Sequence, residues 1–113
     1  MNQRDIVWIR FPYSNLQEAK ARPALIVSRD AYNVEHEDVV ICAVTSNLEP
    51  APYKILLSSE DLVDGDLPLE SMVRADKLIQ VEKALIDTAL GRVDEPTYGQ
   101  VAEAIEKLVR PAK

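Results

Sequence analysis

Short runs of apolar residues, several with a period of two, predict a mainly β protein. Successive side chains of a strand point to opposite faces, so a run that is apolar throughout is covered on both sides. Residues 5–11 and 39–45 fit this description, and 39–45 is the best candidate for a central strand. Residues 53–57 follow Pro52 closely and are expected at a sheet edge. The predicted strands are 5–11, 24–28, 39–45, 53–57, 71–81 and 86–90, residues 82–85 are expected to form a helical turn, and residues 13–22, 29–37 and 58–70 are expected to be loops.

The last predicted element is an amphipathic helix near the end of the sequence. Thr97 and Gln100 have the spacing of a capping box, and Asp94 is an alternative cap one turn earlier. Apolar residues then recur at helical spacing until Pro111 ends the pattern. These residues are Val101, Ala104, Ile105, Leu108 and Val109. Many short strands with one terminal helix favour a small β-barrel with a helix over alternating βαβ units.

Length and composition fit one compact domain over residues 1–113. The chain is 47% hydrophobic, enough for a core of mainly aliphatic residues. A single cysteine, Cys42, rules out an internal disulfide and fits a reducing cytosol. No stretch approaches the roughly 20 apolar residues that span a bilayer. We therefore expect a soluble, cytoplasmic protein with no membrane partner.

The charge distribution limits the partners that the protein could bind. The net charge is −6 and the pI about 4.7, which by itself argues against nucleic acid. However, residues 58–70 contain five acidic residues and no Lys or Arg, so the rest of the chain is close to balanced. A role with nucleic acid therefore requires a local cationic patch rather than a positive total charge.

Missing motifs narrow the possible chemistry further. One His, no CxxC, no GxSxG and no glycine-rich loop leave little support for a metallohydrolase, a nucleotide-binding protein or a redox enzyme. An enzyme with this sequence would have to use Arg, Lys, Asp, Ser and Thr side chains, without a metal or a cofactor. Three polar clusters adjoin predicted strands, at residues 20–23, 45–47 and 71–77.

Each polar cluster has a structural interpretation beside the functional one. Arg74 and Asp76 are two residues apart on a predicted strand, so both point to one face and could handle phosphate and protons together. Such a pair is more often a partly solvated ion pair. Residues 45–47, Thr-Ser-Asn, have the composition of a turn at a strand end. Arg22, just before a proline at a strand entry, is more often a plain surface residue.

Four segments together carry a family resemblance. They are DIVWIRFPY (5–13), RPALIVS (22–28), AVTS (43–46) and SMVRADK (71–77). In order and spacing the chain resembles the MazF/PemK-type toxins over nearly its whole length. The resemblance implies an SH3-like small barrel of the CcdB/MazF/PemK type with a C-terminal helix. It also implies a metal-independent endoribonuclease that cleaves single-stranded RNA by attack of a 2′-hydroxyl on the adjacent phosphate.

The resemblance also assigns roles to residues of the polar clusters. Arg22 and Thr45 would form the core of the site, with Arg22 on the phosphate and Thr45 orienting the phosphate or the nucleophile. Arg74 and Asp76 would also be catalytic, with Asp76 as the candidate base. Because an arginine pKa exceeds about 12, electrostatic stabilisation suits Arg22 better than proton donation. The expected RNA contacts are Lys20, Arg29, Ser46, Ser71 and Lys77.

The partners implied by the resemblance are a second copy of the chain, single-stranded RNA and a cognate antitoxin. The RNA would lie in a groove shared by the homodimer. The antitoxin would lie over the same groove, docking an acidic disordered tail on Arg22 and Arg74. The alternative is a non-catalytic barrel of the CcdB type, which acts by binding a protein target, or a degenerate toxin that only binds its antitoxin.

Overall fold

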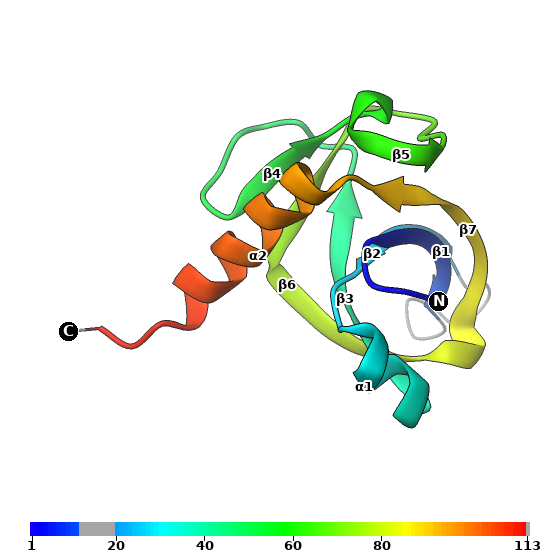
Figure 1. Ribbon diagram of the computed structural model, residues 1–113. Coiled ribbons are helices and arrows are strands. Elements are labelled where there is room, and N and C mark those ends of the chain that lie inside the picture. Colours follow the sequence, from blue (N-terminus) through cyan, green and yellow to red (C-terminus); the bar gives the residue numbers. More distant parts are fainter. Residues whose placement is uncertain (12–19, 113) are drawn as a thin grey trace.

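The protein folds as one antiparallel sheet of seven strands with a helix at its C-terminal end (Figure 1). The computed structural model describes residues 1–11 and 20–112, and it describes side chains for residues 1–10 and 21–112. The strands are β1 (Asp5–Phe11), β2 (Lys20–Ile26), β3 (Asp38–Thr45), β4 (Lys54–Leu57), β5 (Leu62–Gly65), β6 (Ser71–Glu82) and β7 (Ile86–Val93). The helices are α1 (Asp30–Glu35) and α2 (Glu95–Val109), with single 3-10 turns η1 (Ser59–Asp61) and η2 (Lys83–Leu85).

The sheet curls into a barrel that does not close. The strand order is β4-β6-β3-β2-β1-β7-β5, so β4 and β5 are the edges. The predicted edge position of β4 is therefore confirmed. The first four residues of the long strand β6 pair with β4, and nearly the whole strand pairs with β3. In Figure 1, β6 and β7 sweep around β1 and β2, which lie inside the curl.

Two apolar cores occupy the two faces of the central strands. Ile6, Leu25 and Cys42 are paired in register across β1, β2 and β3 and belong to the larger core. Their neighbours in sequence, such as Val7 and Ile41, belong to a second core on the opposite face. Both runs therefore contribute buried side chains to both cores, as predicted, although Arg10 is exposed and Trp8 is only partly buried.

Helix α2 packs its first half on the barrel and extends beyond it. Asp94 is the N-cap, accepting a hydrogen bond from the Thr97 backbone N–H at 2.8 Å, so the expectation of a cap at Thr97 is wrong. Val101 is fully buried, whereas Leu108 and Val109 are 38% and 66% exposed. The helix follows the predicted apolar stripe, but its last turn projects away from the barrel (Figure 1). No helix in the described residues is both long and apolar enough to cross a membrane.

Two predicted loops contain regular structure. Residues 29–37 contain α1, in which buried Asn33 donates to the Ser28 carbonyl at 3.0 Å. Residues 58–70 contain η1 and β5, and β5 pairs with β7. Both elements depend on contacts with distant segments, which a local pattern does not show. Strand β2 begins at Lys20 rather than at residue 24, and β7 continues to Val93.

Strand β7 passes through Gly91 because β5 lies directly against it. Gly65, with a φ of 85°, is paired with Gly91 in the β5–β7 ladder. A Cβ atom on Gly65 would lie 2.3 Å from the Gly91 Cα atom, and one on Gly91 would lie 2.6 Å from the Asp64 carbonyl oxygen. Only two glycines allow this approach. The predicted end of this strand at residue 90 is therefore wrong.

Candidate functional site

A cleft opens where β2 and β3 separate. Strand β2 pairs with β1 from Lys20 to Leu25 but with β3 only from Ala24 to Ile26. Beyond that point β3 stays on β6 as far as Thr45. The resulting cleft has a volume of about 610 Å³, within the range of about 300–1,000 Å³ usual for ligand sites. It is lined by Trp8, Ala21, Arg22, Pro23, Ala43, Val44, Thr45, Ser46, Leu67, Pro68, Leu69, Ser71, Arg74, Lys77 and Leu90.

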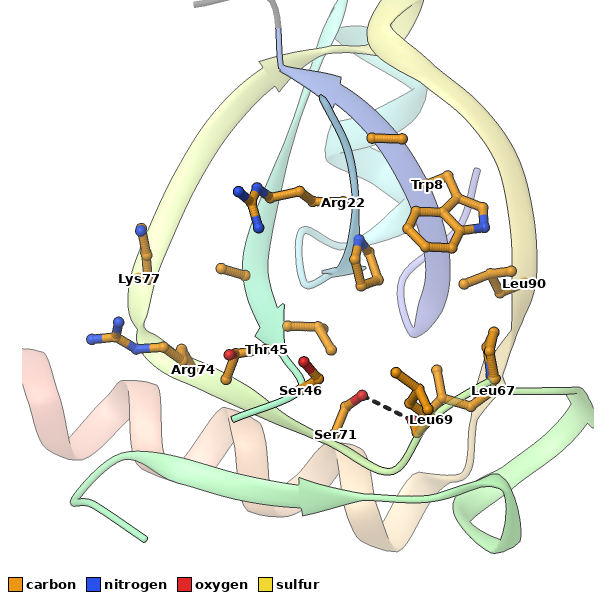
Figure 2. Close-up of a pocket in the computed structure, with 15 residues that line it drawn as sticks. Trp8, Arg22, Thr45, Ser46, Leu67, Leu69, Ser71, Arg74, Lys77 and Leu90 are labelled. Atoms are coloured by element: carbon orange, nitrogen blue, oxygen red, sulfur yellow. Dashed lines mark hydrogen bonds between the residues drawn. The ribbon is translucent and has the colours of Figure 1, made fainter. Parts of the chain in front are cut away.

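The sheet register brings Arg22, Thr45 and Arg74 to one face of the sheet at this cleft. Ala24 of β2 pairs with Ala43 of β3, and Ala43 pairs with Arg74 of β6. Arg22 and Thr45 lie two residues farther along their strands, so they point to the same side as this row. Ala43 lies between the charged side chains and, being small, leaves the space open. Figure 2 shows Arg22, Thr45 and Arg74 along one side of the cleft.

Hydroxyl groups line the floor beside the guanidinium groups. The Thr45 Oγ1 atom accepts a hydrogen bond from the Asn47 backbone N–H at 3.1 Å, so its own proton remains available for donation into the cleft. Ser46 is exposed at the cleft. Ser71 is 4% exposed and donates to the Leu69 carbonyl at 2.9 Å (Figure 2). The segment 45–47 therefore forms the expected turn, and Thr45 and Ser46 line the cleft as well.

Arg74 is held by Asp76 through two hydrogen bonds. The Arg74 Nε and Nη2 atoms donate to the Asp76 carboxylate at 3.3 and 3.1 Å. The Arg74 and Asp76 side chains are 40% and 31% exposed, so this is the partly solvated ion pair that the spacing allows. The hydrogen bond from Arg74 lowers the pKa of Asp76 below its ordinary value of 3.8. A carboxylate so stabilised has a weak affinity for a proton.

A distortion in β6 directs Lys77 into the cleft. Cys42 pairs with Leu78 but the next residue, Ala43, pairs with Arg74, so three residues of β6 are inserted opposite β3. The Ala75 backbone N–H turns to the Tyr53 carbonyl at 2.8 Å, and Tyr53 adopts a positive φ of 67°. In a regular strand Lys77 would share the face of Ala75, which is buried. The bulge instead leaves Lys77 exposed in the lining of the cleft.

The cleft is locally cationic although the protein is acidic. Its described lining contains Arg22, Arg74 and Lys77 and no carboxylate. Guanidinium groups match the geometry of phosphate oxygens, and a cluster of cations attracts a polyanion. The arrangement therefore suits a phosphodiester, held by the cations and by the hydroxyl groups beside them.

Three predicted site residues lie outside this lining. Asp76 lies two residues after Arg74 on β6 and does not line the cleft, but it contacts Arg74, which does. Arg29 is the exposed N-cap residue of α1. The backbone of Lys20 is in β2, but its side chain lies outside the part that the structure describes. Residues Arg22, Thr45, Ser46, Ser71, Arg74 and Lys77 do line the cleft.

The sequence reasoning missed the apolar half of the cleft. Trp8 pairs directly with Pro23, the residue after Arg22, and lines the cleft together with Leu67, Leu69 and Leu90. Pairing a predicted strand at 5–11 with one beginning before Pro23 would have placed the tryptophan opposite Pro23, at the same part of the sheet as Arg22. Among the described residues, no group of three His, Cys, Asp or Glu side chains is arranged to hold a metal ion.

Solved structures of toxins share this fold. An endoribonuclease from a mycobacterial species, in complex with its cognate antitoxin, superposes with a TM-score of 0.81 at 24% identity, over 100% of this chain and 99% of that one. A MazE–MazF complex from Deinococcus radiodurans also gives a TM-score of 0.81, at 21% identity over 99% and 98% of the two chains. The architecture is thus that of the MazF toxins, and the predicted fold class is confirmed.

Sequence comparison places the chain in the family. The family described as PemK-like, MazF-like toxin of type II toxin-antitoxin system matches residues 2–109, so the chain belongs to it. Endoribonuclease MazF6 of Mycobacterium tuberculosis is 27% identical over 113 aligned residues, which cover 96% of each chain. Endoribonuclease MazF2 of Mycobacterium bovis gives the same values. The resemblance inferred from the four sequence segments is confirmed.

Proposed function

We propose that this toxin is an endoribonuclease that cleaves single-stranded RNA in the cleft between β2 and β3. The RNA 2′-hydroxyl attacks the adjacent phosphorus, the bond from phosphorus to the 5′ oxygen breaks, and the products carry a 2′,3′-cyclic phosphate and a 5′-hydroxyl. The 2′ proton leaves to water and the departing 5′ oxygen takes a proton from water. Double-stranded substrate is excluded because the in-line geometry requires splayed bases, and DNA because it has no 2′-hydroxyl.

The protein supplies electrostatic stabilisation of the reacting phosphate. Arg22 and Arg74 would donate to the phosphate oxygens as negative charge grows on them, and Thr45 would donate its free hydroxyl proton. Preorganised donors of this kind are worth about 10²–10³-fold each. Asp76 acts as a positioning residue, because it holds the Arg74 guanidinium and its lowered pKa makes it a weak base. The proposed reaction assigns no role to a metal ion or a cofactor.

One observation carries the proposal. Three strands that are adjacent in the sheet bring two guanidinium groups and a free hydroxyl to one cleft, whose described lining contains no carboxylate. Stability of the fold does not explain this grouping, since Arg22 is exposed and makes no ion pair with any described carboxylate. The family membership and the names of the relatives point in the same direction.

The test is digestion of a long single-stranded RNA by the purified protein in EDTA. Expected products are discrete fragments with 2′,3′-cyclic phosphate and 5′-hydroxyl ends, identified by mass spectrometry. Arg22→Ala should abolish most of the cutting, whereas Arg110→Ala, at the exposed end of α2, is the matched control and should cut normally. Cutting that persists in Arg22→Ala would assign the activity to another site. Intact RNA with the wild type would favour the non-catalytic, CcdB-like alternative.

We further propose that the protein works as a cytoplasmic homodimer restrained by a cognate antitoxin. An antitoxin with carboxylate side chains would cover the cleft and pair with Arg22 and Arg74. A second copy would cover the edge strand β4, where Leu56 is 50% exposed. Light scattering should give twice the chain mass for the wild type and a smaller particle for Leu56→Lys. A wild-type monomer at micromolar concentration would contradict the dimer.

A further inference from the structure

The cleft has a second half that the phosphate chemistry does not use. Figure 2 shows Arg22, Arg74 and Lys77 on one side and Trp8 with Leu90 on the other. The apolar side is formed by β1, β2, β7 and the segment between β5 and β6. Its lining residues are Trp8, Pro23, Leu67, Pro68, Leu69 and Leu90. Leu69 is 64% exposed, so this part of the wall is apolar and open to solvent.

Trp8 is placed in this half by the sheet and is only partly covered by it. It pairs with Pro23 on one side and with Thr88 on the other, at the end of the row that begins with Ile6. Ile6 is fully buried in the larger core, whereas Trp8 is partly exposed. A tryptophan left open beside a cationic surface is available as a flat platform for a ligand.

The ligand must be both flat and attached to an anion. A nucleobase next to the scissile phosphate satisfies both conditions, because one end of the nucleotide enters the apolar half while its phosphate lies among the cations. Stacking of an unpaired base on an aromatic side chain is worth about 1–3 kcal/mol per base and tolerates any base. We propose that the apolar half is a subsite for one unpaired nucleobase, stacked on Trp8 and flanked by Leu69 and Leu90.

This inference rests on the proposed function but reaches a different part of the cleft. An apolar side chain of a protein partner could also enter such a space. The nucleobase is favoured because the subsite is continuous with the cations and, apart from the Trp8 indole N–H, its lining side chains carry no hydrogen-bonding group that would select a peptide. The subsite would also separate the target base from its neighbours, which is the splayed geometry that the in-line attack requires.

The test uses Trp8 as its own reporter, because it is the single tryptophan of the chain. Oligodeoxynucleotides of dA, dC or dT cannot be cleaved, since they lack the 2′-hydroxyl. An abasic phosphodiester of the same length supplies the charges without the bases. Base-bearing oligomers should quench Trp8 fluorescence and bind about tenfold or more tightly than the abasic chain, as one stacked base implies. The abasic chain should bind weakly and without quenching.

Variants separate this inference from the proposed function. Trp8→Phe keeps an aromatic face and should retain most of the preference for base-bearing oligomers, measured by fluorescence anisotropy of labelled oligomers. Trp8→Leu should lose that preference while still binding the abasic chain. Circular dichroism and the Tm identify any variant that has unfolded. Equal binding of base-bearing and abasic chains by the wild type, or an unchanged preference in Trp8→Leu, overturns the nucleobase subsite alone. Failure of every oligomer to bind overturns the RNA-binding cleft itself.

Discussion

Two charged regions of this small barrel use their charges in opposite ways. In the acidic segment, defined as residues 58–70, two of the five carboxylates make hydrogen bonds that hold the fold. Asp61 accepts from the Ser58 backbone N–H at 2.9 Å and from the Thr97 hydroxyl at 3.2 Å, which joins η1 to the start of α2. Asp66 accepts from the Ser59 hydroxyl at 2.8 Å. The acidic segment is therefore part of the scaffold.

Among the described residues, the cationic side chains of the cleft do not join separate elements of the fold in this way. In the part of the chain that the structure describes, the Arg74 side chain is held by Asp76 alone, two residues along the same strand, and Lys77 is exposed through a bulge. The net charge of −6 is thus a poor guide to what the protein binds, because carboxylates used in the scaffold count as much as cations presented to a ligand. A substitution in the cleft should lower activity and leave stability unchanged. A substitution in the acidic segment should lower stability and leave the activity of the folded protein unchanged.

The largest effect is expected for Arg22→Ala. Loss of a preorganised donor to the reacting phosphate should lower kcat/KM for RNA cleavage by about 10²–10³-fold. The Tm should stay within a degree or two of the wild type, because the Arg22 side chain is exposed. The kcat/KM of Arg22→Lys, which keeps the positive charge but loses the planar guanidinium group, should lie between those of the wild type and Arg22→Ala. A parallel loss of Tm and activity would show that Arg22 belongs to the scaffold.

Asp61→Ala should give the next largest effect, on stability rather than on activity. It removes the cap of η1 and the bond to Thr97, and lost caps cost about 0.5–2 kcal/mol. Urea unfolding should show a lower midpoint with an unchanged m-value. The kcat/KM of the folded fraction should match the wild type. A large loss of activity at full folding would contradict the division between the two regions.

A smaller effect is expected for Asp76→Asn, about tenfold in kcat, through loss of the contact that positions Arg74. The lowered pKa keeps Asp76 ionised at all pH values above its ordinary 3.8, and its contribution to stability is lost only as the pH falls through the lowered folded-state value. The pH profile of cleavage between pH 5 and 9 should therefore keep its shape in the variant. Loss of about 10²–10⁴-fold would instead identify Asp76 as the general base.

The smallest effect is expected for Arg29→Ala. Arg29 lies at the N-cap of α1 and does not line the cleft. Its removal should change KM for RNA less than twofold, whereas Lys77→Ala should weaken binding more and reduce its salt dependence. Comparing the two variants at low and moderate salt measures where the RNA path runs. Equal effects at both positions would extend the path to α1.

The strands that carry the site could be predicted from sequence because their patterns are strong. The apolar runs at residues 5–11 and 39–45 supply buried side chains to both cores, so each run can be recognised as a strand without knowing its partner. The family blocks contain Arg22, Thr45 and Arg74, which the sheet register brings to one face. What remained hidden depends on tertiary contacts. Strand β5, Leu-Val-Asp-Gly, is too short and polar to be recognised before its pairing with β7 is known.

Local distortions were the other limit of the sequence reasoning. Regular alternation along residues 71–81 puts Lys77 on the face of Val73 and Ala75 and Asp76 on the face of Arg74. The bulge breaks this alternation after Ala75, so Lys77 lines the cleft and Asp76 does not. The bulge is accompanied by a hydrogen bond from the Ala75 backbone N–H to the carbonyl of Tyr53, which lies in the segment between β3 and β4. The alternation of side chains along one strand therefore cannot reveal the bulge.

The central claim is that Arg22, Thr45 and Arg74 surround the scissile phosphate. The most direct measurement is a crystal structure with a short RNA whose attacking 2′-hydroxyl is replaced by hydrogen, so that the substrate stays intact. The account predicts one phosphate between the Arg22 and Arg74 guanidinium groups, within hydrogen-bonding distance of the Thr45 hydroxyl. A phosphate chain that lies outside the split between β2 and β3, with no phosphate in contact with Arg22, would contradict it.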